Sequence, residues 1–233
     1  MLIQGNALRI PLASGSVGVI LTSPPYNVGL NYDGYDDNLP EKEFKQFNRK
    51  WIYQAYNVMK DGGRMYVAVS DKMRYWIRVI AEDCGWTWVQ DLTWCKPNMV
   101  GRTGVEYEWA MMSEPIMLFR KGKRSTMLNG AEFAPNTFNW FIETVPQSNF
   151  REGRIHPAQF PLSLCLRILS RTPGEPILDP FAGSGSVCVA AKMLGRSCLG
   201  IDIVDSVVVR ANKRLRDTPE PLFVPQPEQM DLL

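Results

Sequence analysis

The chain has 233 residues, of which 45% are hydrophobic and 21% are charged, a composition sufficient for one compact domain with a real core. Its five cysteines lie at least ten positions apart and its one histidine is His156, so a CxxC redox pair, a zinc ribbon and a histidine metal cage are excluded. The scattered cysteines and the lack of a signal-peptide pattern indicate a reducing compartment, and we expect a cytoplasmic location.

The net charge of the whole chain, only +2, says little about its partners. The segment between Arg9 and Asp33 carries no formal charge, but it contains three prolines among several Gly, Ser and Thr residues, so we do not expect it to cross a membrane. The middle third, residues 96–171, holds ten basic and six acidic residues. This mild positive bias alone does not identify a nucleic-acid binder.

The hydrophobic pattern predicts alternating strands and helices along most of the chain. Residues 16–22 (SVGVILT) are typical of a buried strand, which two prolines then stop. Residues 41–60 place apolar side chains three and four positions apart, which predicts an amphipathic helix. The same reasoning predicts strands at 64–69, 86–94, 115–119, 176–179 and 197–202, and helices at 73–84, 161–171, 186–194 and 206–216.

This alternation predicts an α/β fold, with a mostly parallel sheet covered by helices on both faces. Residues 121–155 are rich in Asn, Gly, Pro and Arg and show no sustained period, so we interpret them as an irregular insertion. We therefore expect two halves of one domain, residues 1–120 and 156–216, separated by the insertion at 121–155 and followed by an irregular, proline-rich tail at 217–233.

Residues 177–192 (ILDPFAGSGSVCVAAK) indicate a strand, a tight Gly-Ser turn and a helix. Gly183 and Gly185 permit close approach of the backbone to a ligand, and the helix start offers free N–H groups. No Walker-loop lysine follows, and Cys188 stands where a dinucleotide-binding loop has its third glycine, so phosphate binding is not implied. Asp202 ends the next strand at a spacing suited to ribose hydroxyls. The pattern fits adenosine without a phosphate; glycines that only permit close packing are the structural alternative.

A second pattern, Thr22-Ser23-Pro24-Pro25-Tyr26, follows the first strong strand. Two successive prolines fix the backbone and lack N–H groups, so the turn presents carbonyl oxygens and the Ser23 hydroxyl as acceptors. Acceptors that hold the hydrogens of an amino group draw its nitrogen toward tetrahedral geometry and free its lone pair, while Tyr26 would stack on an extracted base. This chemistry needs neither a histidine nor a metal. Taken alone, the turn equally fits a rigid strand-to-loop junction.

The two patterns together resemble the amino DNA methyltransferases, which use S-adenosylmethionine and carry a Ser/Asp-Pro-Pro-Tyr-type catalytic motif and a Phe-x-Gly-x-Gly cofactor motif. The catalytic motif comes first here, which is similar to the circularly permuted β-class. The resemblance extends from Met1 to about Arg216 and includes GNAL at 5–8, WCKPN at 94–98, EPI at 114–116, FRK at 119–121 and HPAQFP at 156–161. It implies a Rossmann-like, circularly permuted methyltransferase sheet of seven strands with a small target-recognition insertion.

The resemblance also implies roles for individual residues. The catalytic turn, which would hold and stack the target base, consists of Ser23, Pro24, Pro25 and Tyr26. The residues implied to bind S-adenosylmethionine are Asn6, His156, Gln159, Asp179, Pro180, Phe181, Ala182, Gly183, Ser184, Gly185 and Asp202. The residues implied to contact DNA, mostly through phosphates, are Tyr32, Arg120, Lys121, Lys123, Arg124, Arg151 and Arg154. No metal site is implied.

The function implied by the resemblance is methyl transfer from S-adenosylmethionine to the exocyclic amino group of a base flipped out of double-stranded DNA. Ser23 favours N4 of cytosine, and N6 of adenine is the alternative. A C5-cytosine enzyme is excluded because it needs a Pro-Cys nucleophile, and no proline in this chain is followed directly by a cysteine. The permuted order of the motifs favours DNA over RNA or protein amines as the substrate. A catalytically inactive DNA-binding protein of the same fold is the alternative from a different class. A homodimer and a cognate restriction endonuclease stay open as partners, and no membrane contact is expected.

Overall fold

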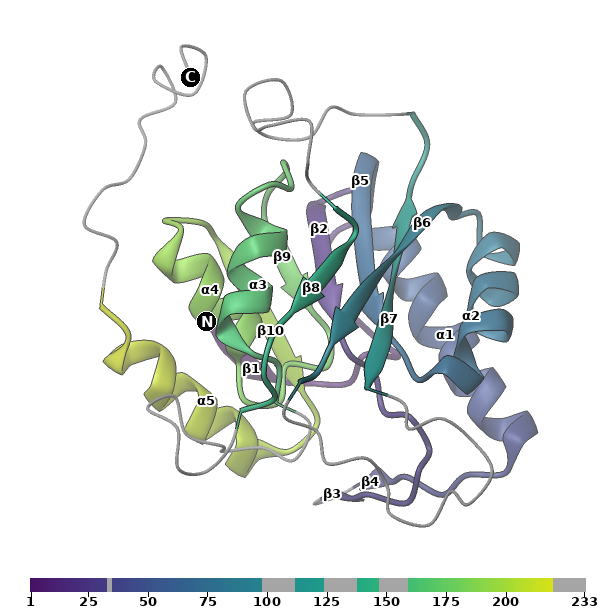
Figure 1. The fold of residues 1–233 in the computed structure, drawn as a ribbon, viewed down its shortest axis with the longest axis horizontal. Coiled ribbons are helices and arrows are strands. Elements are labelled where there is room, and N and C mark those ends of the chain that lie inside the picture. Colours follow the sequence, from purple (N-terminus) through teal and green to yellow (C-terminus); the bar gives the residue numbers. More distant parts are fainter. Residues whose placement is uncertain (33–34, 98–111, 124–137, 147–158, 220–233) are drawn as a thin grey trace.

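One eight-stranded sheet, in the order β1-β10-β9-β2-β5-β7-β6-β8, runs through the computed structural model of the chain (Figure 1). The structure describes residues 1–32, 35–97, 112–123, 138–146 and 159–219. The strands of this sheet are β1 (Leu2–Gln4), β2 (Val17–Thr22), β5 (Met59–Ala68), β6 (Thr87–Cys95), β7 (Ser113–Arg120), β8 (Trp140–Ile142), β9 (Ile177–Asp179) and β10 (Cys198–Asp202). A separate hairpin pairs β3 (Asn31–Tyr32) with β4 (Tyr35–Asp36). The helices are α1 (Glu41–Val58), α2 (Asp71–Asp83), α3 (Leu162–Leu169), α4 (Ser186–Met193) and α5 (Asp205–Asp217).

Strand direction distinguishes the two sides of the sheet on which the strands begin and end. Within the described sheet, β7 is antiparallel to both of its neighbours, β5 and β6, and all other pairings are parallel. The carboxyl ends of the other seven strands therefore share one edge, which we call the carboxyl edge. β7 begins at this edge and ends with Arg120 at the opposite one, the amino edge.

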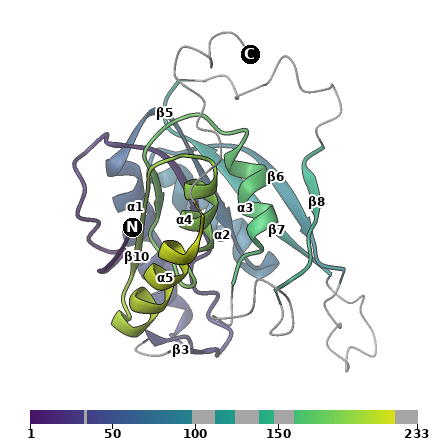
Figure 2. The ribbon, with the colours of Figure 1, turned by 90° about the vertical axis from the view of Figure 1, so that its left-hand side faces the viewer.

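Helices cover both faces of the sheet, as the sequence pattern predicts. α1 and α2 pack on one face, and α3, α4 and α5 pack on the other (Figure 2). In β5, Met65 and Val67 face the first helical layer, whereas Tyr66 and Ala68 face the second. The central strands are thus buried on both sides, and each of their fully buried aliphatic side chains, such as Ile20 of β2, contributes about 1.5–3 kcal/mol.

Three expectations about the elements are wrong. The sheet has eight strands rather than seven, since Leu2–Gln4 pairs with β10, and a strand of three residues is too short to show a period. Residues 140–142, inside the insertion expected to be irregular, form β8 beside β6. α1 ends at Val58 rather than at residue 60, because Met59 already pairs with Val17 of β2. β5 accordingly begins at Met59 rather than at residue 64, and the remaining predicted elements agree with the structure to within two residues at either end.

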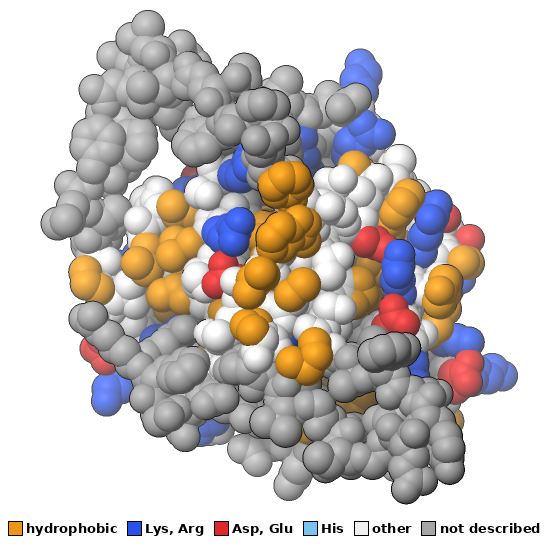
Figure 3. Space-filling view, viewed as in Figure 1, with side chains coloured by type: hydrophobic (Ala, Val, Ile, Leu, Met, Phe, Trp, Pro, Cys, Tyr) orange, Lys and Arg blue, Asp and Glu red, His pale blue; other side chains and the backbone are white. Residues whose placement is uncertain are grey.

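β8 is the last strand on its side of the sheet and exposes apolar side chains. Phe138, Trp140 and Ile142 are 59%, 45% and 56% exposed, and the rings of Phe138 and Trp140 stack with centroids 5.9 Å apart. Figure 3 shows apolar side chains gathered on this face of the molecule. Phe141 points the other way, into the core beside α3. This alternation follows from the two-residue period of a strand and leaves one apolar face of β8 in contact with solvent.

Candidate active site

The carboxyl edge brings the two sequence patterns together at the middle of the sheet. β9 lies between β10 and β2, and the chain leaves this pair in opposite directions, from β2 through α1 to β5 and from β9 through α4 to β10. In open α/β sheets, ligands bind above the strand ends at such a change of direction. The pairing of Ile20 with Leu178, and of Asp179 with Gly200, sets the ends of the three strands side by side.

Asp179 links the catalytic turn to the glycine-rich loop. Its Oδ1 atom accepts a hydrogen bond of 2.8 Å from the Thr22 hydroxyl and one of 3.1 Å from the Phe181 backbone N–H. The pKa of Asp179 is raised from its ordinary 3.8 to about 7, mainly by burial and to a lesser extent by the nearby Asp202, and the two hydrogen bonds oppose this rise. The side chain of Asp179 therefore fastens β2 to β9 directly beneath the site.

The loop after β9 has the backbone that its glycines predict. Gly183 and Gly185 have φ angles of 48° and 75°, a left-handed conformation that costs other residues about 1–2 kcal/mol. The N–H of Gly183 donates to Asp202 Oδ2 at 3.0 Å, and the N–H of Val204 donates to Asp202 Oδ1 at 3.0 Å. Asp202 thus holds the glycine loop to the end of β10. Each of its oxygens keeps a further lone pair for a ligand hydroxyl.

The other described residues predicted to bind a cofactor surround this loop. Asn6 is exposed after β1, and the N–H of its neighbour Gly5 donates to the Asp202 carbonyl at 2.8 Å. The Phe181 ring meets Trp51 of α1 edge-on, with centroids 5.4 Å apart. Gln159 is buried in the segment before α3. Pro180, Ala182 and Ser184 are buried within the loop itself, whereas His156 lies outside the described residues.

The start of α4 ties the loop to the segment that precedes α3. Ser186 Oγ donates to the Phe160 carbonyl at 2.9 Å and lies 3.2 Å from Ser184 Oγ. Arg214 of α5 donates from Nη1 to the Ser184 carbonyl at 3.1 Å and to Ser186 Oγ at 3.0 Å. The sequence analysis did not single out Arg214, because its pattern shows only a basic residue in the last turn of an amphipathic helix.

The turn after β2 lies at the same edge and contacts the start of β7. Pro24 is buried, and the hydroxyl of Ser23 donates to the Tyr26 hydroxyl at 3.1 Å. Tyr26 in turn donates to Glu114 Oε2 at 3.2 Å. Lys96, which follows β6, forms an ion pair with Glu114 Oε1. The chain segments quoted for the resemblance contain both Lys96 and Glu114, but sequence reasoning assigned no role to either.

The loop that follows the turn is anchored by a single carboxylate. Asp37 is buried and accepts hydrogen bonds from the backbone N–H groups of Asn27, Val28 and Leu30 at 2.9–3.0 Å. The backbone of Asn27 is left-handed, with a φ angle of 56°. Tyr32, predicted to contact DNA, lies in β3 of this loop. The structure therefore places Tyr32 in a segment continuous with the catalytic turn.

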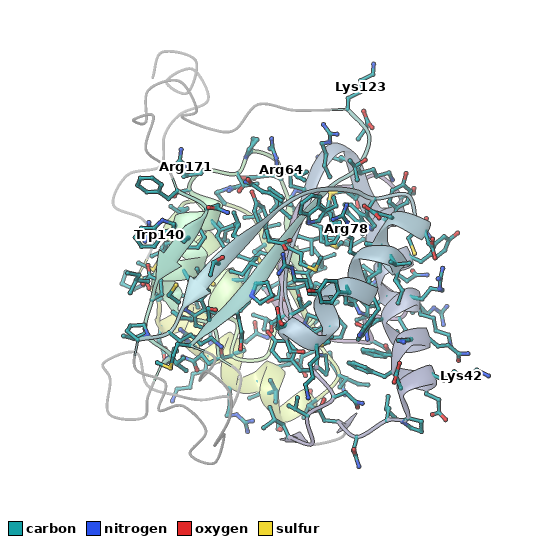
Figure 4. The ribbon with its side chains drawn as sticks, turned by 45° about the vertical axis from the view of Figure 1, so that its right-hand side comes forward. Lys42, Arg64, Arg78, Lys123, Trp140 and Arg171 are labelled. Atoms are coloured by element: carbon teal, nitrogen blue, oxygen red, sulfur yellow. The ribbon has the colours of Figure 1, made fainter. Side chains whose placement is uncertain are left out.

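Of the basic residues predicted to contact DNA, those that the structure describes are not brought to the turn. Arg120 of β7 lies opposite Arg64 of β5 in the backbone register at the amino edge. Lys123 projects from the same edge (Figure 4). Lys121 donates from Nζ to the carbonyls of Tyr56 at 2.7 Å and Met59 at 2.9 Å, so it caps the end of α1. Burial lowers the pKa of the Lys121 ammonium, and Asp61 partly opposes this effect. Arg124, Arg151 and Arg154 lie outside the described residues.

Two features are absent from the part of the chain that the structure describes. Within it, no three side chains of His, Cys, Asp or Glu gather as ligands for a metal ion. No helix in the same residues combines the length and the apolar character needed to cross a membrane. The five cysteines, all in this part, are free.

Comparisons with known proteins find relatives of this chain both in sequence and in fold. A family model described as DNA methylase (N6_N4_Mtase) matches residues 17–213. The type II methyltransferase M.HpaI of Haemophilus parainfluenzae is 30% identical over 234 residues, covering 92% of this chain and 73% of that protein. The structure of the M1.HpyAVI-SAM complex has a TM-score of 0.72 at 24% identity and covers 92% of this chain and 98% of that one. PvuII DNA methyltransferase (cytosine-N4-specific) has a TM-score of 0.77 at 16% identity, covering 99% and 89%. The two structural likenesses show a shared α/β fold.

Proposed function

The chain belongs to the N6/N4 family of DNA methylases, and on this premise we propose that it transfers a methyl group from S-adenosylmethionine to the exocyclic amino group of a base flipped out of duplex DNA. One observation carries the proposal. The Ser-Pro-Pro-Tyr turn and the glycine loop meet at the carboxyl edge, joined by the hydrogen bond of 2.8 Å between Thr22 and Asp179. The hydrogen-bond acceptors proposed to hold the amine therefore lie next to the loop proposed to bind the adenosine cofactor.

The residues of the glycine loop fit S-adenosylmethionine, the ligand in the M1.HpyAVI-SAM complex. Gly183 and Gly185 give the loop a left-handed backbone without side chains, and Asp202 has lone pairs left for ribose hydroxyls. Asn6, which the resemblance assigns to the adenine, follows Gly5, whose N–H donates to the Asp202 carbonyl, and the ring of Phe181 is only partly buried. When bound, the cofactor supplies an activated methyl group on a sulfonium centre.

The turn after β2 supplies the chemistry of this chain. The Ser23 hydroxyl and the Pro24 carbonyl accept hydrogens of the target amine, and Pro25 keeps the turn rigid. The ring of Tyr26 stacks on the flipped base. Because these groups act by position and hydrogen bonding, the rate gain comes from alignment of the amine with the methyl group.

The proposal also names the target base. Ser23 is a neutral acceptor, which favours N4 of cytosine over N6 of adenine within the family. Mass spectrometry of nucleosides from DNA of cells that express the chain is expected to show N4-methylcytosine. N6-methyladenine as the sole product contradicts the choice of base but supports the reaction. No methylated base at all supports the inactive, DNA-binding alternative.

Because M.HpaI is named a type II methyltransferase, we extend the proposal to a restriction-modification system. In such a system a cognate endonuclease cuts the same DNA site when it is unmethylated. DNA from expressing cells is then expected to resist that endonuclease. The DNA contacts predicted for Arg124, Arg151 and Arg154 stay part of this proposal.

A further inference from the structure

Four side chains at the carboxyl edge form one continuous hydrogen-bonded row. Ser23 Oγ lies 3.1 Å from the Tyr26 hydroxyl, which lies 3.2 Å from Glu114 Oε2. The second oxygen of Glu114 is ion-paired with Lys96. The row therefore leads from the catalytic turn to a carboxylate at the start of β7.

Three contacts hold the far end of this row in place. The side chain of Lys96 is 7% exposed and that of Glu114 is 23% exposed, so water screens their attraction weakly. Lys96 Nζ also lies 4.2 Å from the ring centroid of Trp94, the residue that pairs with Glu114 across β6 and β7. The backbone N–H of Lys96 donates to the Met112 carbonyl at 2.7 Å, which continues the ladder beyond the strand ends.

The chemistry of the groups sets the direction of the hydrogen bonds. An ionised carboxylate only accepts, so the one hydrogen of the Tyr26 hydroxyl must point to Glu114. The Tyr26 oxygen can then only accept from Ser23, so the Ser23 hydrogen points away from the target amine. Both lone pairs of Ser23 Oγ are left for the amine, which is what an acceptor of its hydrogens requires.

We propose that Glu114, held by Lys96, is a positioning residue that acts through Tyr26 to keep Ser23 an acceptor and to take up the proton released in methyl transfer. This role rests on the proposed function. In the reaction, the nitrogen lone pair forms the N–C bond, and the C–S bond breaks with its electron pair on sulfur. The nitrogen then loses one proton to Ser23 Oγ, Ser23 passes its own proton to Tyr26, and Tyr26 passes its proton to Glu114.

The test replaces the carboxylate by a group of the same shape. In Glu114→Gln the amide N–H can donate to Tyr26, which reverses the row and turns the Ser23 hydrogen toward the amine. The single-turnover methylation rate is expected to fall about 10²-fold, with the dissociation constants for DNA and S-adenosylmethionine changed by no more than about twofold. Glu114→Asp keeps the charge and is expected to retain a higher rate than Glu114→Gln.

A matched control removes the same charge elsewhere. Glu143 is also partly buried, pairs with Arg167 at 3.3 Å and accepts a hydroxyl hydrogen bond from Ser163, but it does not reach the turn. Glu143→Gln is expected to keep the wild-type rate. If Glu114→Gln keeps its rate as well, the proposal is overturned.

A second substitution separates the hydroxyl of Tyr26 from its ring. Tyr26→Phe keeps the ring for stacking but breaks the row, so we expect the same loss of rate as in Glu114→Gln and no further loss in the double variant. Additive losses would overturn the relay even if one of the variants folds poorly. Methyl transfer by the wild-type chain is measured first, because its absence overturns the proposed function itself. Transfer by the wild type with undiminished rates in the variants overturns only the relay.

Discussion

Among single residues, the buried Asp179 links the catalytic turn to the glycine loop. Its two hydrogen bonds both end on Oδ1, so a proton on the second oxygen disturbs neither of them. Because burial raises its pKa to about 7, the folded chain binds this proton more tightly than the unfolded chain does. The stabilisation is thus present at low pH and is lost as the pH rises through the folded-state pKa.

We predict that the free energy of unfolding of the cofactor-free chain falls as the pH rises from about 4 to about 7, and levels off above that range. Asp179→Asn keeps the Oδ1 acceptor and places a neutral amide at the second oxygen. The variant is therefore expected to lose this part of the pH dependence. Urea unfolding at several pH values checks the prediction, and parallel curves for the two proteins would contradict it.

Asp202 has two tasks, since it holds Gly183 and is proposed to meet the ribose hydroxyls. Asp202→Ala is expected to weaken binding of S-adenosylmethionine by at least about tenfold, a loss of about 1.4 kcal/mol. Calorimetric titration measures the affinity, and circular dichroism checks that the sheet and helices persist. An unaltered affinity in a folded variant would remove Asp202 from the site.

At the scale of elements, Lys121 joins two parts of the fold that are far apart in sequence. Its ammonium caps the carbonyls at the end of α1 and lies 4.3 Å from the ring centroid of Tyr56. Lys121→Met is expected to lower the free energy of unfolding by about 1–2 kcal/mol, because charged hydrogen bonds to the helix end are lost. Urea unfolding measures this change. The exposed Lys50 of the same helix provides the control, and equal losses in Lys50→Met would refute the capping role.

Elements differ in how far their sequence pattern alone determines them. β2 is predicted because two prolines stop a β-branched apolar run, and α1 because apolar side chains recur three and four positions apart over residues 41–60. β1 and β8 have three residues each, too few to show a period. Both exist because a neighbouring strand end offers unpaired backbone groups, and that neighbour is distant in the chain.

At the scale of the whole molecule, the sheet separates the catalytic turn from the described basic residues of the region predicted to contact DNA. Arg120, Lys121 and Lys123 lie at the amino edge, whereas a base delivered to Ser23 reaches the carboxyl edge. The reversal of β7 produces this separation. A strand that ran parallel to β5 would have carried these residues to the catalytic edge.

We therefore expect Lys123→Ala to leave the affinity for duplex DNA, and its dependence on salt, nearly unchanged. A lysine that contacts a phosphate would instead lower the salt slope by about 1 when removed. Fluorescence anisotropy at several salt concentrations distinguishes the two outcomes. A reduced slope would support the phosphate contact that the sequence predicts for Lys123.

The alternation of strands and helices, the two motifs and their order along the chain can all be predicted from the sequence, because local spacing and turn chemistry carry that information. The folded chain is needed to see that Thr22 donates a hydrogen bond to Asp179, that Tyr26 donates to Glu114, which is ion-paired with Lys96, and that Lys121 caps a helix. These contacts join residues far apart in the chain, and they depend on strand order and on the direction of β7. A period within one segment cannot encode such pairings, since they are set by how the segments pack together.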